Sequence, residues 1–418
     1  MVDEIAKPER RVDLDWIRII AFGLLILYHV GMLFVPWDYH VKSAHILPSL
    51  EPLMLALNPW RLSLLFLVSG AATRFMANKL APAALFKGRA ARLLPPLLFG
   101  MFVIVPPQSY FQVVEKSGFA GSFVQFYLSR YLAFAPQFCE AGRCLMLPTW
   151  NHLWFVVYLF VYTAVLALLL AVAPRLVRGV EIRLAPALSG VGLLLLPALA
   201  LAALRLFVYP SFPQTNTLIG DWYNHALYGT VFAFGYLFAL DEGVAAATQR
   251  LRWPALVTAI ICYASFMLWR VLRQEGVQLP EALTLYSRFA YGAFQWVSIL
   301  AILGFGRRWL TRDTAARRYL TDAVFPYYIV HQTTIIATAY ALRDWALPAA
   351  AEAALILAAT FASCALTYEI VRRIAWLRPL FGLKLLNTRH SGLKPLRCPT
   401  EGSRNAAAEA LTISADSR

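Results

Sequence analysis

The sequence is dominated by long runs of apolar residues, each close to the length that a helix needs to cross a lipid bilayer. About 20 such residues span the hydrocarbon core as an α-helix. The first run, DWIRIIAFGLLILYHVGMLFV, occupies residues 15–35. Because lipid offers the backbone no hydrogen-bond partners, only helices and closed barrels cross a membrane. The runs are continuous rather than alternating, which favours helices over a barrel. We therefore predict an all-α fold, a polytopic integral membrane bundle.

About ten transmembrane helices are expected. The predicted spans are 15–35, 56–77, 92–114, 150–173, 184–208, 222–241, 253–272, 285–305, 322–342 and 350–372. A segment without a strong apolar run, 115–148, separates the third span from the fourth. The chain accordingly divides into an N-terminal segment (1–14), a transmembrane domain (15–373) and a basic, partly disordered tail (374–418).

The basic residues predict the orientation of the bundle. The chain has a formal net charge of +15 and is 60% hydrophobic. Most Lys and Arg residues lie in alternate connections between spans or in the tail, where the positive-inside rule and anionic lipid headgroups account for them. This distribution argues against nucleic acid as a partner. It places both termini in the cytoplasm, and an even number of spans agrees with that placement. The first 14 residues are charged and show no signal peptide.

Two ionisable residues share one face of the first predicted span. Arg18 and His29 are 11 positions apart, which brings a helix round to within about 20° of its starting direction, roughly 16 Å further along the axis. An ionisable group inside the membrane costs on the order of 3 kcal/mol unless it faces protein or water. A neutral imidazole near neutral pH suits a general base. The pair is therefore a candidate catalytic feature.

Each member of this pair also has a plain structural interpretation. His29 could be a buried histidine bonded to a backbone carbonyl, and Arg18 could be an interfacial anchor whose guanidinium reaches the headgroups. Asp13 and Asp15 could cap the start of the helix or pair with Arg18.

Further arginines flank the second and third spans. Arg61 and Arg74 bracket the small-residue patch Ser69–Ala72, which favours a close contact with another helix or a ligand. Arg89 and Arg92 are three residues apart and share a face if the segment is helical. Two guanidiniums at the membrane surface suit phosphate groups, although a positive-inside flank explains them equally well. The pair Pro95–Pro96 is expected to break or kink the chain that follows.

The other candidate residues give weaker indications. His152, His225 and His331 lie within or beside spans, and each could be a satisfied core histidine. Cys139 and Cys144 share a predicted external loop and could form a disulfide in an oxidising compartment. No metal site is predicted, because the cysteines lack further ligands nearby in sequence. Motifs of serine hydrolases, NTPases and zinc proteases are missing from the sequence.

Five stretches, in order along residues 10–375, resemble the membrane-bound acyltransferase 3 family. They are RVDLDWIRIIAFGLLILYHV with its Arg-x10-His, LSLLFLVSG, FKGRAARLLPP with its Arg-x-x-Arg, NHLWFVVYL and YYIVHQ. Within the family the chain is similar to the glucan biosynthesis protein C type, the periplasmic glucan succinyltransferases. The family commonly has two aromatics where Leu65–Phe66 stands here, which is a mild departure.

The resemblance implies a function and roles for four residues. Such proteins move an acyl group, here acetyl or succinyl, from a cytoplasmic acyl-CoA-type thioester to a hydroxyl of an extracytoplasmic carbohydrate or glucan. His29 would be the catalytic base and Arg18 its partner, while Arg89 and Arg92 would contact the donor's phosphates. The thioester is then a co-substrate, and no permanently bound cofactor or metal is expected. The implied location is the bacterial inner membrane, with lipids, the donor and a glycan acceptor as partners.

The residues leave several alternatives open. A membrane transporter or exporter of a sugar or lipid-linked intermediate would use the same charged groups as a pathway, although paired inverted repeats are not evident. A non-catalytic scaffold would use them as interhelical hydrogen-bonding groups. The identity of the acyl group, the acceptor, and the choice between direct transfer and an acyl-histidine intermediate are not determined by the sequence.

Overall fold

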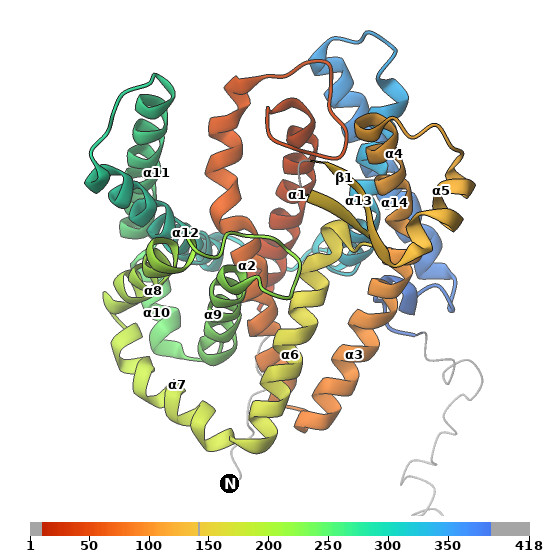
Figure 1. Cartoon of the computed structure of the whole chain (residues 1–418). Helices are drawn as coiled ribbons and strands as arrows, with labels where there is room; N and C mark the ends of the chain where they lie inside the picture. The colour runs from red at the N-terminus through yellow and green to blue at the C-terminus, as the bar shows by residue number, and fades with distance from the viewer. Residues whose placement is uncertain (1–10, 141–142, 386–418) are drawn as a thin grey trace, which may run out of the picture. The chain divides into compact units, whose positions relative to one another are not determined.

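The computed structural model describes residues 11–140 and 143–385, which fold as an assembly of helices with one small β-hairpin (Figure 1). The predicted segment 1–14 is described only from residue 11, and the predicted tail only as far as residue 385. The helices are α1 (Val12–Phe34), α2 (Glu51–Ala77), α3 (Pro82–Phe99), α4 (Pro106–Ser117), α5 (Phe123–Ser129), α6 (Trp154–Val172), α7 (Pro174–Leu188), α8 (Gly192–Ala203), α9 (Trp222–Phe238), α10 (Glu242–Arg250), α11 (Arg252–Gln274), α12 (Glu281–Trp309), α13 (Ala315–Leu342) and α14 (Ala349–Arg373).

The helices confirm the all-α membrane bundle. In the described part of the chain, seven helical segments are long and apolar enough to cross a membrane, and up to nine if two sharply bent pairs each count as one span. The predicted span 322–342 lies within α13, which is 28 residues long but is not among those nine. This helix carries Arg317, Arg318 and Asp322 near its start and His331 further on, so its apolar character is diluted. The chain is a multi-pass membrane protein.

The predicted span 184–208 is not one straight helix, because the chain turns sharply near its start. α7 ends at Leu188 and α8 starts at Gly192, and the two helices meet at an angle of 115°. A Cβ atom on Gly192 would lie 1.9 Å from the carbonyl oxygen of Ala187, so this close approach requires glycine. A comparable bend of 114° separates α9 from α10.

The Pro95–Pro96 pair does not end its helix. α3 continues through both prolines to Phe99, and residues 100–104 then form one π-helical turn before α4 begins at Pro106. A π-helical turn is a common place for a helix to deviate from straight geometry. The helix irregularity that we expected at the prolines therefore lies a few residues further along the chain, at residues 100–104. Gly100, at its start, packs directly against the Leu153 side chain.

The small-residue patch on α2 is a helix-packing notch. A Cβ atom on Gly70 would lie 2.0 Å from the carbonyl oxygen of Phe232 on α9. In return, a Cβ atom on Gly235 of α9 would lie 2.0 Å from the carbonyl oxygen of Leu67. The reciprocal glycines let the two backbones touch, as in small-residue motifs of membrane helices. This contact anchors α2, which carries Arg61, against α9.

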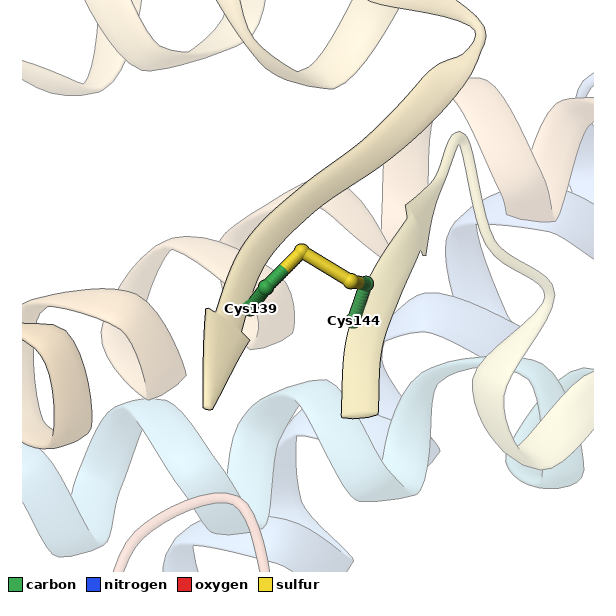
Figure 2. Close-up of a disulfide and its surroundings, with 2 residues drawn as sticks. All are labelled: Cys139 and Cys144. Atoms are coloured by element: carbon green, nitrogen blue, oxygen red, sulfur yellow. A yellow bond between two sulfur atoms is a disulfide. The ribbon is translucent and has the colours of Figure 1, made fainter. Parts of the chain in front are cut away.

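The segment 115–148 forms a small structured cap on α4. It contains α5 and the antiparallel strands β1 (Ala135–Glu140) and β2 (Arg143–Leu147). Apolar side chains of this cap and of α4 form a separate buried cluster, which consists of Val113, Phe126, Tyr131 and Leu147. The possible disulfide is present: Cys139 and Cys144 are bonded and link the two strands (Figure 2).

Candidate active site

His29 lines a cavity of about 200 Å³ among α1, α2, α6, α9 and α13. Arg61 of α2, His152 just before α6 and Tyr328 of α13 line the same space. The structure therefore brings polar groups from several spans to one buried position. An intramembrane histidine that faces a cavity, rather than lipid, fits a functional role.

A second histidine defines the protonation of His29. The Nδ1 atom of His331 lies 2.7 Å from the carbonyl oxygen of Tyr328, and its Nε2 atom lies 3.1 Å from Nδ1 of His29. A carbonyl oxygen only accepts hydrogen bonds, so Nδ1 of His331 carries the hydrogen. In a neutral His331 the Nε2 atom is then an acceptor, and Nδ1 of His29 must donate to it. His29 consequently keeps the lone pair on its Nε2 atom, the atom that a general base needs.

Arg61 places a buried cation in the same cavity, and it makes no ion pair with any residue that the structure describes. Only 3% of this residue is exposed, and its Nε and Nη1 atoms have no hydrogen-bond partner in the described part of the chain. Its guanidinium carbon stacks 3.6 Å from the centre of the Tyr28 ring, next to His29 in sequence. Arg74, by contrast, donates to Glu181 at 2.9 Å. A buried cation without a counter-ion is costly, so Arg61 is suited to negative charge that arrives with a ligand.

Buried amides connect His152 to a fourth histidine, His40. Gln108 is fully buried; its Nε2 atom lies 3.3 Å from Nδ1 of His152, and its Oε1 atom accepts from Nε2 of Gln332 at 3.2 Å. Gln332 Nε2 also lies 3.0 Å from Nε2 of His40, whose Nδ1 faces Oε1 of Gln112 at 2.6 Å. These partners match a neutral His40 with hydrogen on Nδ1. His40 lies in the connection after α1, where burial lowers its pKa to about 4.

A large basic cavity of about 620 Å³ lies at the other end of the site. It opens around the N-terminal part of α1 and the C-terminal end of α14. Its cationic lining residues are Arg18, Arg92, Arg372, Arg378 and Lys384, and its acidic ones are Asp15 and Asp322. Five cations against two carboxylates leave a clear positive excess. Such a set is suited to a ligand that carries several phosphates.

A narrow cavity of about 130 Å³ lies between the basic cavity and the cavity of His29. It shares Arg18, Arg92 and Thr321 with the basic cavity. It shares Phe155 with the cavity that holds His29. Three cavities with shared lining residues therefore lie between the basic surface and the imidazole, and Phe155 is the residue that the last two have in common.

The four predicted site residues occupy different positions along this series. His29 lines the cavity of about 200 Å³, called the inner cavity from here on. Arg18 lines the basic cavity and the narrow cavity. Arg18 donates to the carbonyl oxygen of Thr321 at 3.0 Å and lies 3.9 Å from a carboxylate oxygen of Asp15. The suggested pairing of Asp15 with Arg18 is thus present. Asp13 and Asp15 do not cap α1, which begins at Val12 without a side-chain capping bond.

The segment that carries Arg89 and Arg92 is helical, since both lie on α3, but their surroundings differ. Arg92 lines the basic cavity, whereas Arg89 lines only the narrow one. Arg89 donates to the Thr73 hydroxyl and to the carbonyl oxygen of Ser69 at 3.3 Å. The geometry therefore offers Arg92 to a ligand in the basic cavity and ties Arg89 to α2.

Two features of the site were not predicted from the sequence, where His331 is only a candidate histidine without a partner. His331 contacts His29 across 302 positions, and only the folded arrangement of α1 and α13 brings them together. Gln214 and Asn216 line the inner cavity from an irregular connection, 209–221. His225 lies outside that cavity; its Nε2 atom is 2.6 Å from the carbonyl oxygen of Leu218, which is a structural role.

Residues 11–369 match the family model of an acyltransferase domain, acyltransferase 3. The match covers nearly all of the membrane-embedded part of the chain and supports membrane acyltransferase activity in general. No curated protein and no solved structure matches the chain.

Proposed function

The chain belongs to the acyltransferase 3 family, and on that premise we propose that it moves an acyl group from a cytoplasmic acyl-CoA-type thioester to a carbohydrate hydroxyl outside the membrane. The observation that carries this proposal is the series of three cavities with shared walls that leads from five cations to His29. Such a path suits a ligand with an anionic head and a long, thin, uncharged arm that ends in the reactive group.

The basic cavity would hold the anionic part of the donor. Arg92 and Arg372 lie on different helices, so their forked donors approach a phosphate-bearing ligand from two sides. The pantetheine arm would then pass through the narrow cavity, beside Arg89 and Phe155, and present the thioester in the inner cavity. Phosphates stay at the surface, which avoids the cost of moving them into the membrane.

The transfer step follows from the protonation of His29. The acceptor hydroxyl donates its proton to Nε2 of His29 while its oxygen attacks the thioester carbonyl carbon. The carbonyl oxygen becomes an oxyanion, and the guanidinium of Arg61 supplies the positive charge that stabilises it. When the C–S bond breaks, the thiolate leaves and takes the proton from the imidazolium of His29. The products are an ester and the free thiol of the donor.

His331 is proposed to support this cycle as a positioning residue. Its bond to the Tyr328 carbonyl orients the ring, so that Nδ1 of His29 has an acceptor both before and after protonation. The imidazolium form of His29 then donates from both nitrogens, to His331 and to the leaving sulfur.

The disulfide supports the proposed orientation. Disulfides persist in oxidising compartments such as the bacterial periplasm. The Cys139–Cys144 hairpin would therefore face outward, whereas the basic cavity lies at the ends of α1, α3, α13 and α14 that the positive-inside rule assigns to the cytoplasm. A location in the bacterial inner membrane and a glucan acceptor, as for glucan succinyltransferases, complete the proposal.

Acyl transfer by the purified protein in lipid nanodiscs tests the proposal. Labelled acetyl-CoA and succinyl-CoA are supplied with soluble glucan oligosaccharides, and esters are identified by mass spectrometry. His29→Ala should abolish ester formation while the protein stays folded by size-exclusion chromatography. Leu27→Ala, at a lipid-exposed position on the same helix, is the matched control and should retain activity. Near-normal ester formation by His29→Ala would falsify the assignment of the base.

A further inference from the structure

The connection between the π-helical turn at 204–208 and α9 borders the cavity of His29. Gln214 and Asn216, in this connection, both line the cavity. Gln214 is at the same time exposed, so the cavity reaches the protein surface at this connection. The surface lies on the expected outer side, opposite the basic cavity.

A buried carboxylate holds this connection in one conformation. Asp221 is fully buried and accepts hydrogen bonds from the backbone N–H groups of Thr215, at 3.2 Å, and Asn216, at 2.9 Å. The hydroxyl of Tyr158 also donates to it. Asn216 has a positive φ of 58°, which asparagine tolerates better than most residues. The position of the two amides is therefore defined before any ligand binds.

The two amides are linked through Asn224, and each keeps one polar atom for a ligand. Nε2 of Gln214 donates to Oδ1 of Asn224 at 2.7 Å, and Nδ2 of Asn224 donates to Oδ1 of Asn216 at 3.0 Å. Oε1 of Gln214 and Nδ2 of Asn216 make no hydrogen bond to any other described residue. One hydrogen-bond acceptor, Oε1 of Gln214, and one donor, Nδ2 of Asn216, thus remain beside the cavity.

We propose that Gln214 and Asn216 form the subsite that binds the sugar acceptor, with neighbouring hydroxyls of a neutral carbohydrate as the ligand. A sugar hydroxyl donates and accepts, so one hydroxyl donates to Gln214 and the next accepts from Asn216. Trp154 and Tyr228 line the same cavity and offer aromatic surface to the apolar face of a sugar ring. The amides carry no charge, which favours a neutral ligand. This subsite deepens the proposed acyl transfer and rests on it.

The test compares two acceptors in the same reaction, cellotetraose as a neutral glucan probe and 1-propanol as a monohydric alcohol. The measured quantity is the ratio of kcat/KM for cellotetraose to kcat/KM for propanol, with the donor saturating. Gln214→Ala removes the free acceptor. Asn216→Gly removes the free donor but keeps the positive φ and the backbone bond to Asp221. Each variant should lower the ratio about 5- to 10-fold, the equivalent of one lost hydrogen bond.

Ile219→Ser is the matched control, because Ile219 lies in the same connection, is 88% exposed and does not line the cavity. Its ratio should equal that of the wild type. A wild type without preference for cellotetraose, or an unchanged ratio in Gln214→Ala, would overturn the subsite. If Gln214→Ala lost activity with cellotetraose and with propanol to the same extent, the subsite would be overturned too. The side chain would then contribute only to folding. A wild type that consumes no thioester with any acceptor contradicts the acyl transfer itself.

Discussion

The Nε2 atom of His331 lies 3.1 Å from the Nδ1 atom of His29, and the two residues are 302 positions apart in the sequence. Since His331 also donates to a carbonyl oxygen, this contact assigns the hydrogen of His29 to Nδ1 and its lone pair to Nε2. The contact fixes the tautomer of a histidine in an apolar helix, and this tautomer is the one that the proposed general base requires.

Replacing His331 should therefore lower turnover without weakening donor binding. His331→Leu leaves Nδ1 of His29 without an acceptor and frees the ring to adopt the wrong tautomer, so kcat should fall by about 10- to 100-fold. His331→Gln supplies an amide oxygen near the position of Nε2 and should recover most of kcat. KM for the donor should stay within about 2-fold of wild type in both variants. If the His331→Leu and His331→Gln variants lose kcat to the same extent, His331 does not orient the ring of His29.

Arg61 should affect the chemical step for every donor. Arg61→Met keeps the volume of the side chain but removes the charge, and the loss of one oxyanion-stabilising group typically costs about 100-fold or more in kcat. Acetyl-CoA and succinyl-CoA, assayed side by side, should lose activity to the same degree. A loss confined to succinyl-CoA would instead assign the guanidinium to the carboxylate of the acyl group.

The basic cavity predicts a difference between donors with and without phosphates. Arg92→Gln and Arg372→Gln should each raise KM for acyl-CoA by about 10-fold, because a charge-assisted bond to phosphate is lost. KM for the corresponding acyl-pantetheine, which lacks the nucleotide, should not change. Arg178→Gln, at an exposed position on α7, is the control and should leave both values unchanged. Equal increases for the two donors would contradict phosphate binding in this cavity.

His40 predicts an acid-sensitive contribution to stability. Its pKa is about 4 in the folded protein, below the ordinary value of 6.5, because burial disfavours the charged form. The unfolded chain therefore binds a proton more readily, and this contribution to stability is complete above pH 6.5 and is lost as the pH falls toward 4. Thermal unfolding in detergent at pH 7.5 and pH 5 should show a smaller acid-induced drop in Tm for His40→Gln than for wild type. An identical drop would show that His40 is not held neutral.

Much of the fold could be predicted from hydropathy, because apolar runs of helix length admit few other structures in lipid. The break between α7 and α8 was not predictable in this way, since the turn depends on how closely Gly192 approaches Ala187. The site was predictable only in part. The period of a helix places Arg18 and His29 on one face, but it carries no information about which helix lies opposite. His331, Gln214 and Asn216 enter the site through tertiary contacts between distant segments, which no spacing along the chain indicates.

The most direct test of the central claim is a structure of the protein in nanodiscs with a non-hydrolysable acyl-CoA analogue. The account predicts phosphates in the basic cavity within hydrogen-bond distance of Arg92 and Arg372. It also predicts the pantetheine arm beside Phe155, and the acyl carbonyl next to Nε2 of His29. A nucleotide bound at any other surface, or an acyl chain that ends on the basic side of Phe155, would contradict it.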